Sequence, residues 1–350
     1  MSPIVHLNDY FPIRGHYEHV GGRNLGGFVR RIGLAMSVAA VVIGTFVGAA
    51  SASASPLPVR FSGLDAVNYL VTHPDAPPPG ANDWSCRPSP AHPRPVVLVH
   101  GTQANMTIDW FTLAPMLKNA GFCVFAFNFG VQATIRIGGV IDVVGGTAPI
   151  EDSARELAAF VDRVRTATGA PEVDIVGHSQ GGSMPRYYLS YLGGNRVVNT
   201  FVGVEPTNHG TDAGGLLSDW LLGPIAQRLG DDPAVTPLLD ALTLRSSVQQ
   251  VQGSAYVHEI NDRAPHGGVD PNVRYVVIAS ATDTTVTPTS SMFLTGPNVT
   301  NILLQSGCPL ALDDHQGVLY GRYAMGVVLH ELDPAVPTPS CSLSLPYIGG

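Results

Sequence analysis

The sequence of 350 residues has little charge of either sign and almost no lysine. Charged residues make up 13% of the chain, and Lys118 is the only lysine. Acidic residues outnumber basic ones by 27 to 19, and the basic residues form no long runs. Such a chain binds nucleic acids and anionic membranes poorly, because both carry dense negative charge. We therefore expect no nucleic-acid partner and a neutral substrate.

Internal repeats and long low-complexity segments are also missing, which disfavours solenoids and disorder. Residues 1–54 have the layout of a targeting segment. Arg30 and Arg31 precede an apolar run from Ile32 to Ala50, and the small residues 52–54 follow it. This pattern predicts a secretory signal peptide, with a translation start near Val29 as an alternative to Met1. A membrane anchor is the competing interpretation, because the apolar run is long enough. We expect residues 55–350 to form one secreted domain.

The cysteines are few and show no metal-binding pattern. Neither a C-x-x-C motif nor closely paired histidines are present, so we expect no metal. An even number of cysteines in an exported chain predicts two disulfides, with three possible connectivities. We expect the sequential pairs, each closing a loop of about 35 residues. The four residues are Cys86, Cys123, Cys308 and Cys341.

Short apolar runs alternate along the chain with helical patterns. Such runs are typical of strands buried on both faces of a parallel sheet. The clearest helical pattern covers Glu151–Thr168, and others cover Gly63–Val71 and Asp109–Ala120. The alternation predicts an α/β fold, a doubly wound and mostly parallel sheet with helices on both faces. The expected strands are Pro95–His100, Phe122–Asn128, Val173–Gly177, Val197–Val204, Arg274–Ser280 and Val299–Leu304.

The segment from Thr211 to Asn261 interrupts this alternation with clustered leucines and Trp220. Two interpretations stay open. Its helices pack on the sheet, or they form a cap-like insertion over an apolar substrate channel. On the second interpretation, Trp220 and Leu221 contact the substrate.

The strongest motif is G-x-S-x-G at residues 177–181, directly after an expected strand. It predicts a tight strand-to-helix turn that presents the Ser179 hydroxyl above the sheet. A serine nucleophile needs a histidine base and an acid that orients the base. In this fold the chain order is serine, acid, histidine, and Asp283 and His315 follow later strands in that order. Ser179, Asp283 and His315 are therefore the predicted catalytic residues.

Other residues compete for these roles. Asp283 alternatively caps its own turn, and His315 alternatively lies in an acidic surface loop. Competing acids are Asp270, Asp313 and Asp314, and competing bases are His258, His266 and His330.

Two backbone N–H groups are needed to stabilise a tetrahedral oxyanion. The residue after the nucleophile, Gln180, supplies one. The loop after the first strand supplies the other, from Thr102 or alternatively from Gln103. A second His-Gly-Thr sequence at residues 209–211 is expected to shape the wall of the site.

With these residues assembled, the chain resembles the bacterial secreted class 2 lipases, an α/β-hydrolase family, over roughly residues 84–330. The resemblance implies triacylglycerol or simpler ester hydrolysis by a Ser-Asp-His triad without a cofactor, and a disulfide between Cys86 and Cys123. Gln103 stands where the family normally has an aromatic residue, which bears on the size of the acyl pocket. The similar segments are Pro95–Thr102, Trp110, Leu113–Pro115, Ala120–Ala126, Gly177–Gly182, His209–Thr211, Thr282–Pro288 and His315.

The sequence thus predicts a secreted serine hydrolase of lipid esters that makes transient contact with a lipid interface. A short-chain carboxylesterase or polyester hydrolase has the same catalytic residues and differs in its pocket. A non-catalytic protein that binds lipid or a cell-wall component is the alternative from another class. A peptidase of the same fold is disfavoured, because nothing in the chain indicates amide specificity.

Overall fold

Successive residues of the central strands point to opposite faces of one sheet, and both faces are buried. In β1 (Val96–Val99), Val97 and Val99 pack into one apolar cluster, whereas Val96 and Leu98 pack into another. This burial explains why the strand is apolar at every position. The sheet has the order β2 (Val124–Phe127), β1, β5 (Val173–His178), β6 (Val198–Val204), β7 (Arg274–Ala279) and β8 (Val299–Leu303), and all neighbours are parallel.

These elements come from a computed structural model, which describes residues 55–74, 76–137, 140–215 and 223–350. The predicted signal peptide, residues 1–54, lies outside the described residues. Within the described part, no helix has the length and apolar character needed to cross a membrane.

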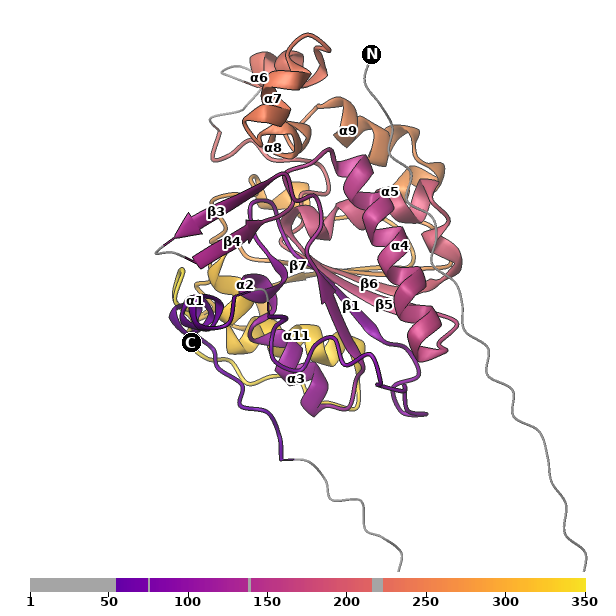
Figure 1. Ribbon diagram of the computed structural model, residues 1–350, viewed down its shortest axis with the longest axis vertical. Coiled ribbons are helices and arrows are strands. Elements are labelled where there is room, and N and C mark those ends of the chain that lie inside the picture. Colours follow the sequence, from indigo (N-terminus) through magenta and orange to yellow (C-terminus); the bar gives the residue numbers. More distant parts are fainter. Residues whose placement is uncertain (1–54, 75, 138–139, 216–222) are drawn as a thin grey trace, which may run out of the picture. The chain divides into compact units, whose positions relative to one another are not determined.

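Helices cover both faces of the sheet (Figure 1). On one face lie α4 (Ile150–Thr168) and α5 (Met184–Tyr191), whose apolar side chains join Val97 and Val99. On the other lie α3 (Leu113–Asn119) and α11 (Arg322–Leu332), which join Val96 and Leu98. The predicted doubly wound sheet is confirmed.

The strand order reverses direction beside the turn at Ser179. The chain passes from β1 outward to β2 and then returns to β5 on the other side of β1. Loops that leave β1 and β5 therefore diverge, and in open parallel sheets ligands bind where this happens. Ser179 follows β5 directly.

Two local predictions were incomplete. The helix expected over Asp109–Ala120 is two helices, α2 (Met106–Trp110) and α3, and the chain turns between them at Phe111 and Thr112. Asn105 caps α2 by accepting the N–H groups of residues 107 and 108. The antiparallel hairpin of β3 (Ala133–Ile137) and β4 (Val140–Val144) was not predicted.

The segment that interrupts the alternation is helical where it is described. It forms α6 (Gly223–Asp231), α7 (Thr236–Ala241), α8 (Arg245–Gln249) and α9 (Ala255–His258). Tyr256 and Val257 of α9 pack into the cluster beneath α4 and α5. In contrast, Leu238 of α7 is 57% exposed. Packing on the sheet therefore accounts for α9, and a cap role for α6 to α8 stays a prediction.

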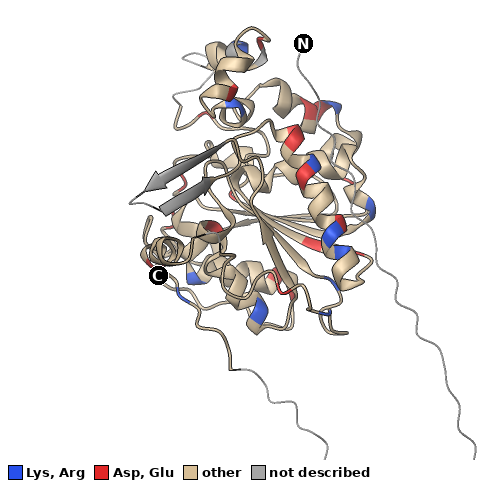
Figure 2. Cartoon of the chain, in the orientation of Figure 1, with Lys and Arg blue, Asp and Glu red and all other residues tan. Residues whose placement is uncertain are grey.

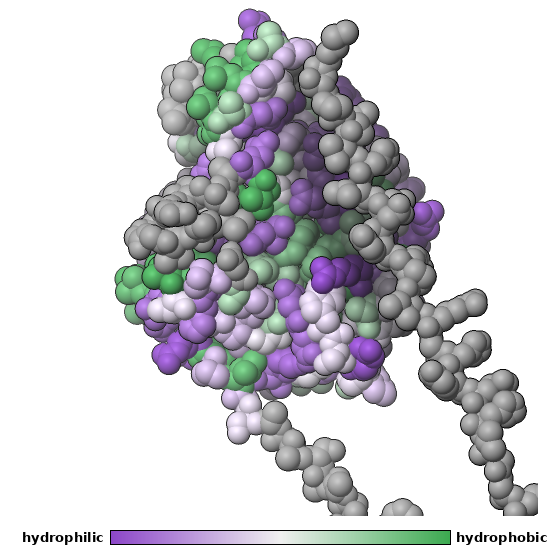
Figure 3. Space-filling view, in the orientation of Figure 1, coloured by the Kyte–Doolittle hydropathy of each residue, from purple (hydrophilic) through white to green (hydrophobic). Residues whose placement is uncertain are grey.

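The surface carries few charges, and these gather along α4 (Figure 2). Arg155 pairs with Asp152 there, and Arg165 pairs with Asp162 further along the helix. In each pair the two residues are three positions apart. Hydrophobic side chains surface elsewhere, around α1 (Gly63–Thr72) and around α6 to α8 (Figure 3). Along α1, Leu64 is 72% exposed and Val67 is 51% exposed.

Both sequential disulfides are present. Cys86 bonds to Cys123 and Cys308 bonds to Cys341, with sequence separations of 37 and 33. The second bond holds the segment from 341 onward against the loop before residue 315. In the same place Leu312 N–H donates to Ser344 O at 3.2 Å.

Removing either disulfide should destabilise the fold to a similar extent. The two loops have nearly the same length. By restricting the unfolded chain, each bond therefore contributes about 4 kcal/mol to the free energy of unfolding in the chain-entropy model. We expect urea unfolding of the Cys86→Ser/Cys123→Ser and Cys308→Ser/Cys341→Ser proteins to show comparable losses in the free energy of unfolding. A loss confined to one pair would contradict the loop-closure explanation.

Candidate active site

The turn at Ser179 brings three backbone segments into close contact. β5 leads directly into η1 (Ser179–Gly182), and Ser179 has a left-handed φ of 55°. A Cβ atom on Gly177 would lie 1.7 Å from the Gly181 carbonyl oxygen, and one on Gly181 would lie 2.2 Å from that of Val99. A larger residue at either position would push these backbones apart. The packing of the turn therefore requires both glycines of the motif.

Three side chains from separate loops converge over this turn. His315 Nε2 lies 2.9 Å from Ser179 Oγ, and His315 Nδ1 lies 2.7 Å from Asp283 Oδ2. Asp283 follows β7, and His315 follows α10 (Leu304–Gly307). Ser179 is 7% exposed and Asp283 is 4% exposed. The structure thus brings together the three predicted catalytic residues in the geometry of a nucleophile, a base and an orienting acid.

Asp283 also caps its own turn, as the alternative interpretation expected, and its catalytic role stays a prediction. Its Oδ1 accepts the N–H groups of Thr285 at 2.6 Å and Val286 at 3.0 Å. Burial raises the pKa of Asp283, but the hydrogen bond and charge of His315 and the two amides hold that pKa below its usual value. Asp283 is therefore ionised and set to orient His315.

The competing residues have other partners. Asp314 Oδ1 accepts the N–H groups of Gly317 and Tyr347, and Asp313 bonds to Ser344. The remaining candidates lie in other contacts: Asp270 with Asn195 and Asn272, His258 with Asp262, His330 with the Val336 carbonyl, and His266 exposed at the surface.

The loop after β1 lies against the nucleophile turn. A Cβ on Gly101 would lie 3.0 Å from Ser179 Cβ. A Cβ on Gly146 would lie 2.8 Å from Gln180 Oε1 and 3.0 Å from Thr102 Cα. Gly146 therefore lies against both Thr102 and the Gln180 side chain, and the role of the two backbone amides as an oxyanion hole stays a prediction.

The predicted substrate contacts are only partly described. Gln103 is exposed and has a left-handed φ of 55°, in the same loop as Thr102. Trp220 and Leu221 lie outside the described residues, so their contact with substrate stays a prediction.

A buried histidine–aspartate pair underlies the site, and sequence reasoning missed it. His178 Nδ1 lies 2.9 Å from Asp109 Oδ2, and His178 Nε2 lies 2.9 Å from the main-chain oxygen of His315. Asp109 Oδ2 also accepts the Gly101 N–H at 2.8 Å. Asp109 thus connects the loop after β1, the residue before the nucleophile and the histidine loop.

The hydrogen bonds determine the charges of this pair. Both nitrogens of His178 face oxygen acceptors, so both donate and the ring is a cation. Burial raises the pKa of Asp109, but the charge of His178 and the hydrogen bonds to His178 and Gly101 bring it below its usual value. The pair is a fully buried ion pair that tethers the backbone of His315.

Glu205 is a second residue that the sequence reasoning did not single out. It follows β6 directly and is fully buried, and its Oε2 lies 3.3 Å from His315 Nδ1. Chemistry was expected just after each apolar run, so the position of Glu205 after β6 was the available signal.

The cluster does not suit a metal ion. His178, Glu205 and His315 place three possible ligand atoms within 4.8 Å of one another. Both His178 nitrogens donate to oxygens, and a protonated nitrogen has no lone pair for a metal. The nitrogens of His315 are engaged with Asp283 and Ser179.

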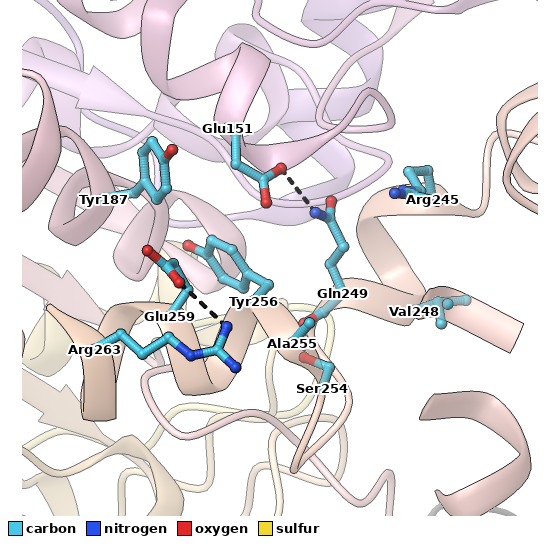
Figure 4. A pocket seen from close by; sticks show the side chains of 11 residues that line it. Glu151, Tyr187, Arg245, Val248, Gln249, Ser254, Ala255, Tyr256, Glu259 and Arg263 are labelled. Atoms are coloured by element: carbon cyan, nitrogen blue, oxygen red, sulfur yellow. Dashed lines mark hydrogen bonds and ion pairs between the residues drawn. The ribbon is translucent and has the colours of Figure 1, made fainter. Parts of the chain in front are cut away.

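A separate cavity of about 500 Å³ lies between α4, α5, α8 and α9 (Figure 4). Polar side chains of its lining bond to one another in two places. Glu151 accepts from Gln249 at 2.8 Å, and Arg263 lies 3.4 Å from Glu259. None of the three converging residues lines it. This cavity is therefore distinct from the Ser179 site.

Known proteins share the fold and the motif region. A model of the family described as "Lipase (class 2)" matches residues 93–291, which is more than half of the chain. The chain belongs to the class 2 lipase family. The matched range contains Ser179 and Asp283, and His315 lies beyond it.

Two curated relatives are triacylglycerol lipases of Pseudarthrobacter phenanthrenivorans and Burkholderia plantarii. Each is 33% identical over 99 residues, which is 27% of this chain and 27% and 24% of the two relatives. The match thus spans about a quarter of the length of these relatives. The crystal structure of Aspergillus fumigatus lipase B is similar with a TM-score of 0.54 and 21% identity, covering 75% of this chain and 56% of that chain. The shared architecture is the α/β-hydrolase fold.

Replacing Asp109 should destabilise the protein strongly. Asp109→Asn leaves the buried His178 cation without its counter-ion, which costs about 3–5 kcal/mol of unfolding free energy. Urea unfolding measures this loss. The matched control is Asp152→Asn on α4, where an exposed ion pair contributes less than about 1 kcal/mol. Equal, small effects of both substitutions would contradict the ion pair.

His100 should make the protein less stable as the pH falls. Its ring stacks on Phe129, Nδ1–H donates to Gly101 O and Nε2 accepts the Phe129 N–H. Burial lowers the pKa of His100 to about 4. Between pH 6.5 and 4, His100 is therefore protonated in the unfolded chain but neutral in the folded chain. As the pH falls through this range, the free energy of unfolding decreases.

We expect wild type to lose up to about 3 kcal/mol more unfolding free energy over this pH range than His100→Gln, which has no such proton. Urea unfolding at several pH values measures the difference. Parallel pH curves for the two proteins would show that His100 is not buried in its neutral form.

Proposed function

We propose that this protein is a secreted serine hydrolase that cleaves carboxylic esters of lipids, as a triacylglycerol lipase, through Ser179, His315 and Asp283. The observation that carries the proposal is the continuous hydrogen-bond chain from Ser179 Oγ through both nitrogens of His315 to Asp283. The chain's membership of the class 2 lipase family supports the same activity.

The geometry supports acyl transfer in two steps. His315 Nε2 takes the proton of Ser179 as its Oγ attacks the ester carbonyl, and Asp283 stabilises the imidazolium that forms. His315 then returns the proton to the leaving alcohol. In the second step the same nitrogen activates water, which hydrolyses the acyl-enzyme and restores Ser179.

The backbone amides of Thr102 and Gln180 form the proposed oxyanion hole. Their residues meet around Gly146 beside Ser179, and Gln180 opens the helical turn that follows the nucleophile. Amides aimed at the developing negative oxygen stabilise the tetrahedral intermediate more than the uncharged ester. The proposed reaction needs no cofactor.

A lipid substrate is supported by the surface and by the relatives. Exposed apolar side chains lie along α1, including Leu64 and Val67, and on α7, including Leu238 (Figure 3). Such side chains favour transient contact with a lipid interface. The two curated relatives carry the name triacylglycerol lipase.

Secretion is part of the proposal. Two disulfides in one domain are typical of proteins that fold in an oxidising compartment. The layout of residues 1–54 is that of a cleaved signal peptide, which leaves residues 55–350 as the α/β-hydrolase domain.

Ester hydrolysis should depend on Ser179. We expect Ser179→Ala to lower kcat/KM by at least about 10⁴-fold on p-nitrophenyl esters, because the nucleophile is lost while binding remains. The ester series runs from acetate to palmitate. A preference for long chains fits a lipase, whereas a preference for acetate and butyrate fits a short-chain carboxylesterase.

The matched control is Ser153→Ala, a buried serine on α4 that should keep both activity and labelling by a fluorophosphonate. Equal and feeble rates in wild type and Ser179→Ala would reject the hydrolase and favour a lipid-binding protein.

A further inference from the structure

Glu205 occupies an unusual place beside the proposed base. His315 Nδ1 faces two carboxyl groups, Asp283 Oδ2 at 2.7 Å and Glu205 Oε2 at 3.3 Å. The backbone of Glu205 is fixed in a left-handed conformation, with φ of 46°, by its N–H bond to Ile278 O at 2.7 Å. A non-glycine residue adopts this conformation at a cost, and strain of this kind is concentrated at functional sites.

The hydrogen bonds around the two carboxyl groups are unequal. Asp283 accepts three N–H groups, from His315, Thr285 and Val286. Among the described residues, neither oxygen of Glu205 has a hydrogen bond of this kind. N–H donors favour the ionised form of a carboxyl group, so the charge belongs on Asp283.

A proton must therefore reside on Glu205. Its Oε2 and Asp283 Oδ2 both approach His315 Nδ1, at 3.3 Å and 2.7 Å, in a buried site, and two carboxylates this close cannot both stay ionised. Burial, together with the charge of Asp283, raises the pKa of Glu205 well above its usual value. The titratable groups that face it are Asp283, Asp313, Asp314, His315 and His178.

We infer that Glu205 is a second, normally protonated acid of the site, which donates a hydrogen bond to Asp283 and replaces it as the acceptor for His315 Nδ1–H when Asp283 is removed. This inference rests on the proposed ester hydrolysis. In the intact enzyme Glu205 is a positioning residue.

Removing Asp283 tests the replacement. Loss of the orienting acid alone lowers kcat by about 10⁴-fold in serine hydrolases. In Asp283→Ala the neighbouring negative charge is gone, so Glu205 ionises at a lower pH and can accept the His315 proton. We expect a loss of only about 10²-fold, with residual kcat rising as the pH is raised through the ionisation of Glu205.

The double variant Asp283→Ala/Glu205→Gln should lose a further factor of about 10² and the pH dependence of the residual rate. Glu205→Gln alone keeps a neutral donor of the same shape, so we expect less than about a tenfold loss of kcat. If Asp283→Ala is as inactive as the double variant at every pH, Glu205 is not a reserve acid and the inference is overturned.

Asp174 supplies a matched control. It is a buried carboxyl group on β5 that bonds to Arg94 and Asn199, and burial raises its pKa as well. Asp283→Ala/Asp174→Asn should lose thermal stability but keep the rate and pH profile of Asp283→Ala. An equal loss of residual activity in this control would indicate general destabilisation and would overturn the role of Glu205.

An infrared measurement tests the proton on Glu205 without activity. The difference spectrum between wild type and Glu205→Gln at pH 7 should contain the carbonyl stretch of a protonated carboxylic acid. A carboxylate band in its place would overturn the inference. Failure of the wild type to hydrolyse esters or to react with a fluorophosphonate would reject the proposed function and the reserve role, while the infrared band would still report the shared proton.

Discussion

The site depends on how closely three backbone segments approach one another at the nucleophile. Gly177, Gly181 and the carbonyl groups at the end of β1 lie so near that a single Cβ atom would clash. This contact fixes Ser179 in its left-handed conformation and brings the loop of Thr102 beside it. The positions of Ser179 and of the loop that holds Thr102 are thus set by the packing of the main chain. Side-chain rotamers have little freedom to alter them.

The ring and the backbone of His315 are held by groups of opposite charge. Its ring is oriented by Asp283, while its backbone oxygen is held by the buried cation of His178. His178 is paired with Asp109, whereas His315 gains and loses a proton in the proposed reaction. The low dielectric around both pairs strengthens each interaction and also makes an unpaired charge costly. The same burial explains why an extra carboxyl group beside Asp283 has to be neutral.

The sequence predicted the parts of the site that local patterns encode. A strand followed by G-x-S-x-G identifies Ser179, and chain order identifies Asp283 and His315. Glu205 and Asp109 depend on contacts between segments distant in sequence, which no local pattern contains. Helix α2 begins at Met106, before the predicted start at Asp109, because Asn105 caps it. The β3–β4 hairpin was missed although the sequence places Gly138 and Gly139 between its strands, a two-residue hairpin signal.

The bond between Cys308 and Cys341 anchors the loop that carries His315. Residues 344 and 347 also bond to this loop, since Leu312 N–H donates to Ser344 O and Tyr347 N–H donates to Asp314 Oδ1. The turn at Ser179 is instead packed against the end of β1. A reducing agent would therefore loosen the support of His315 before that of Ser179, which makes the histidine side of the site the one that responds to redox conditions.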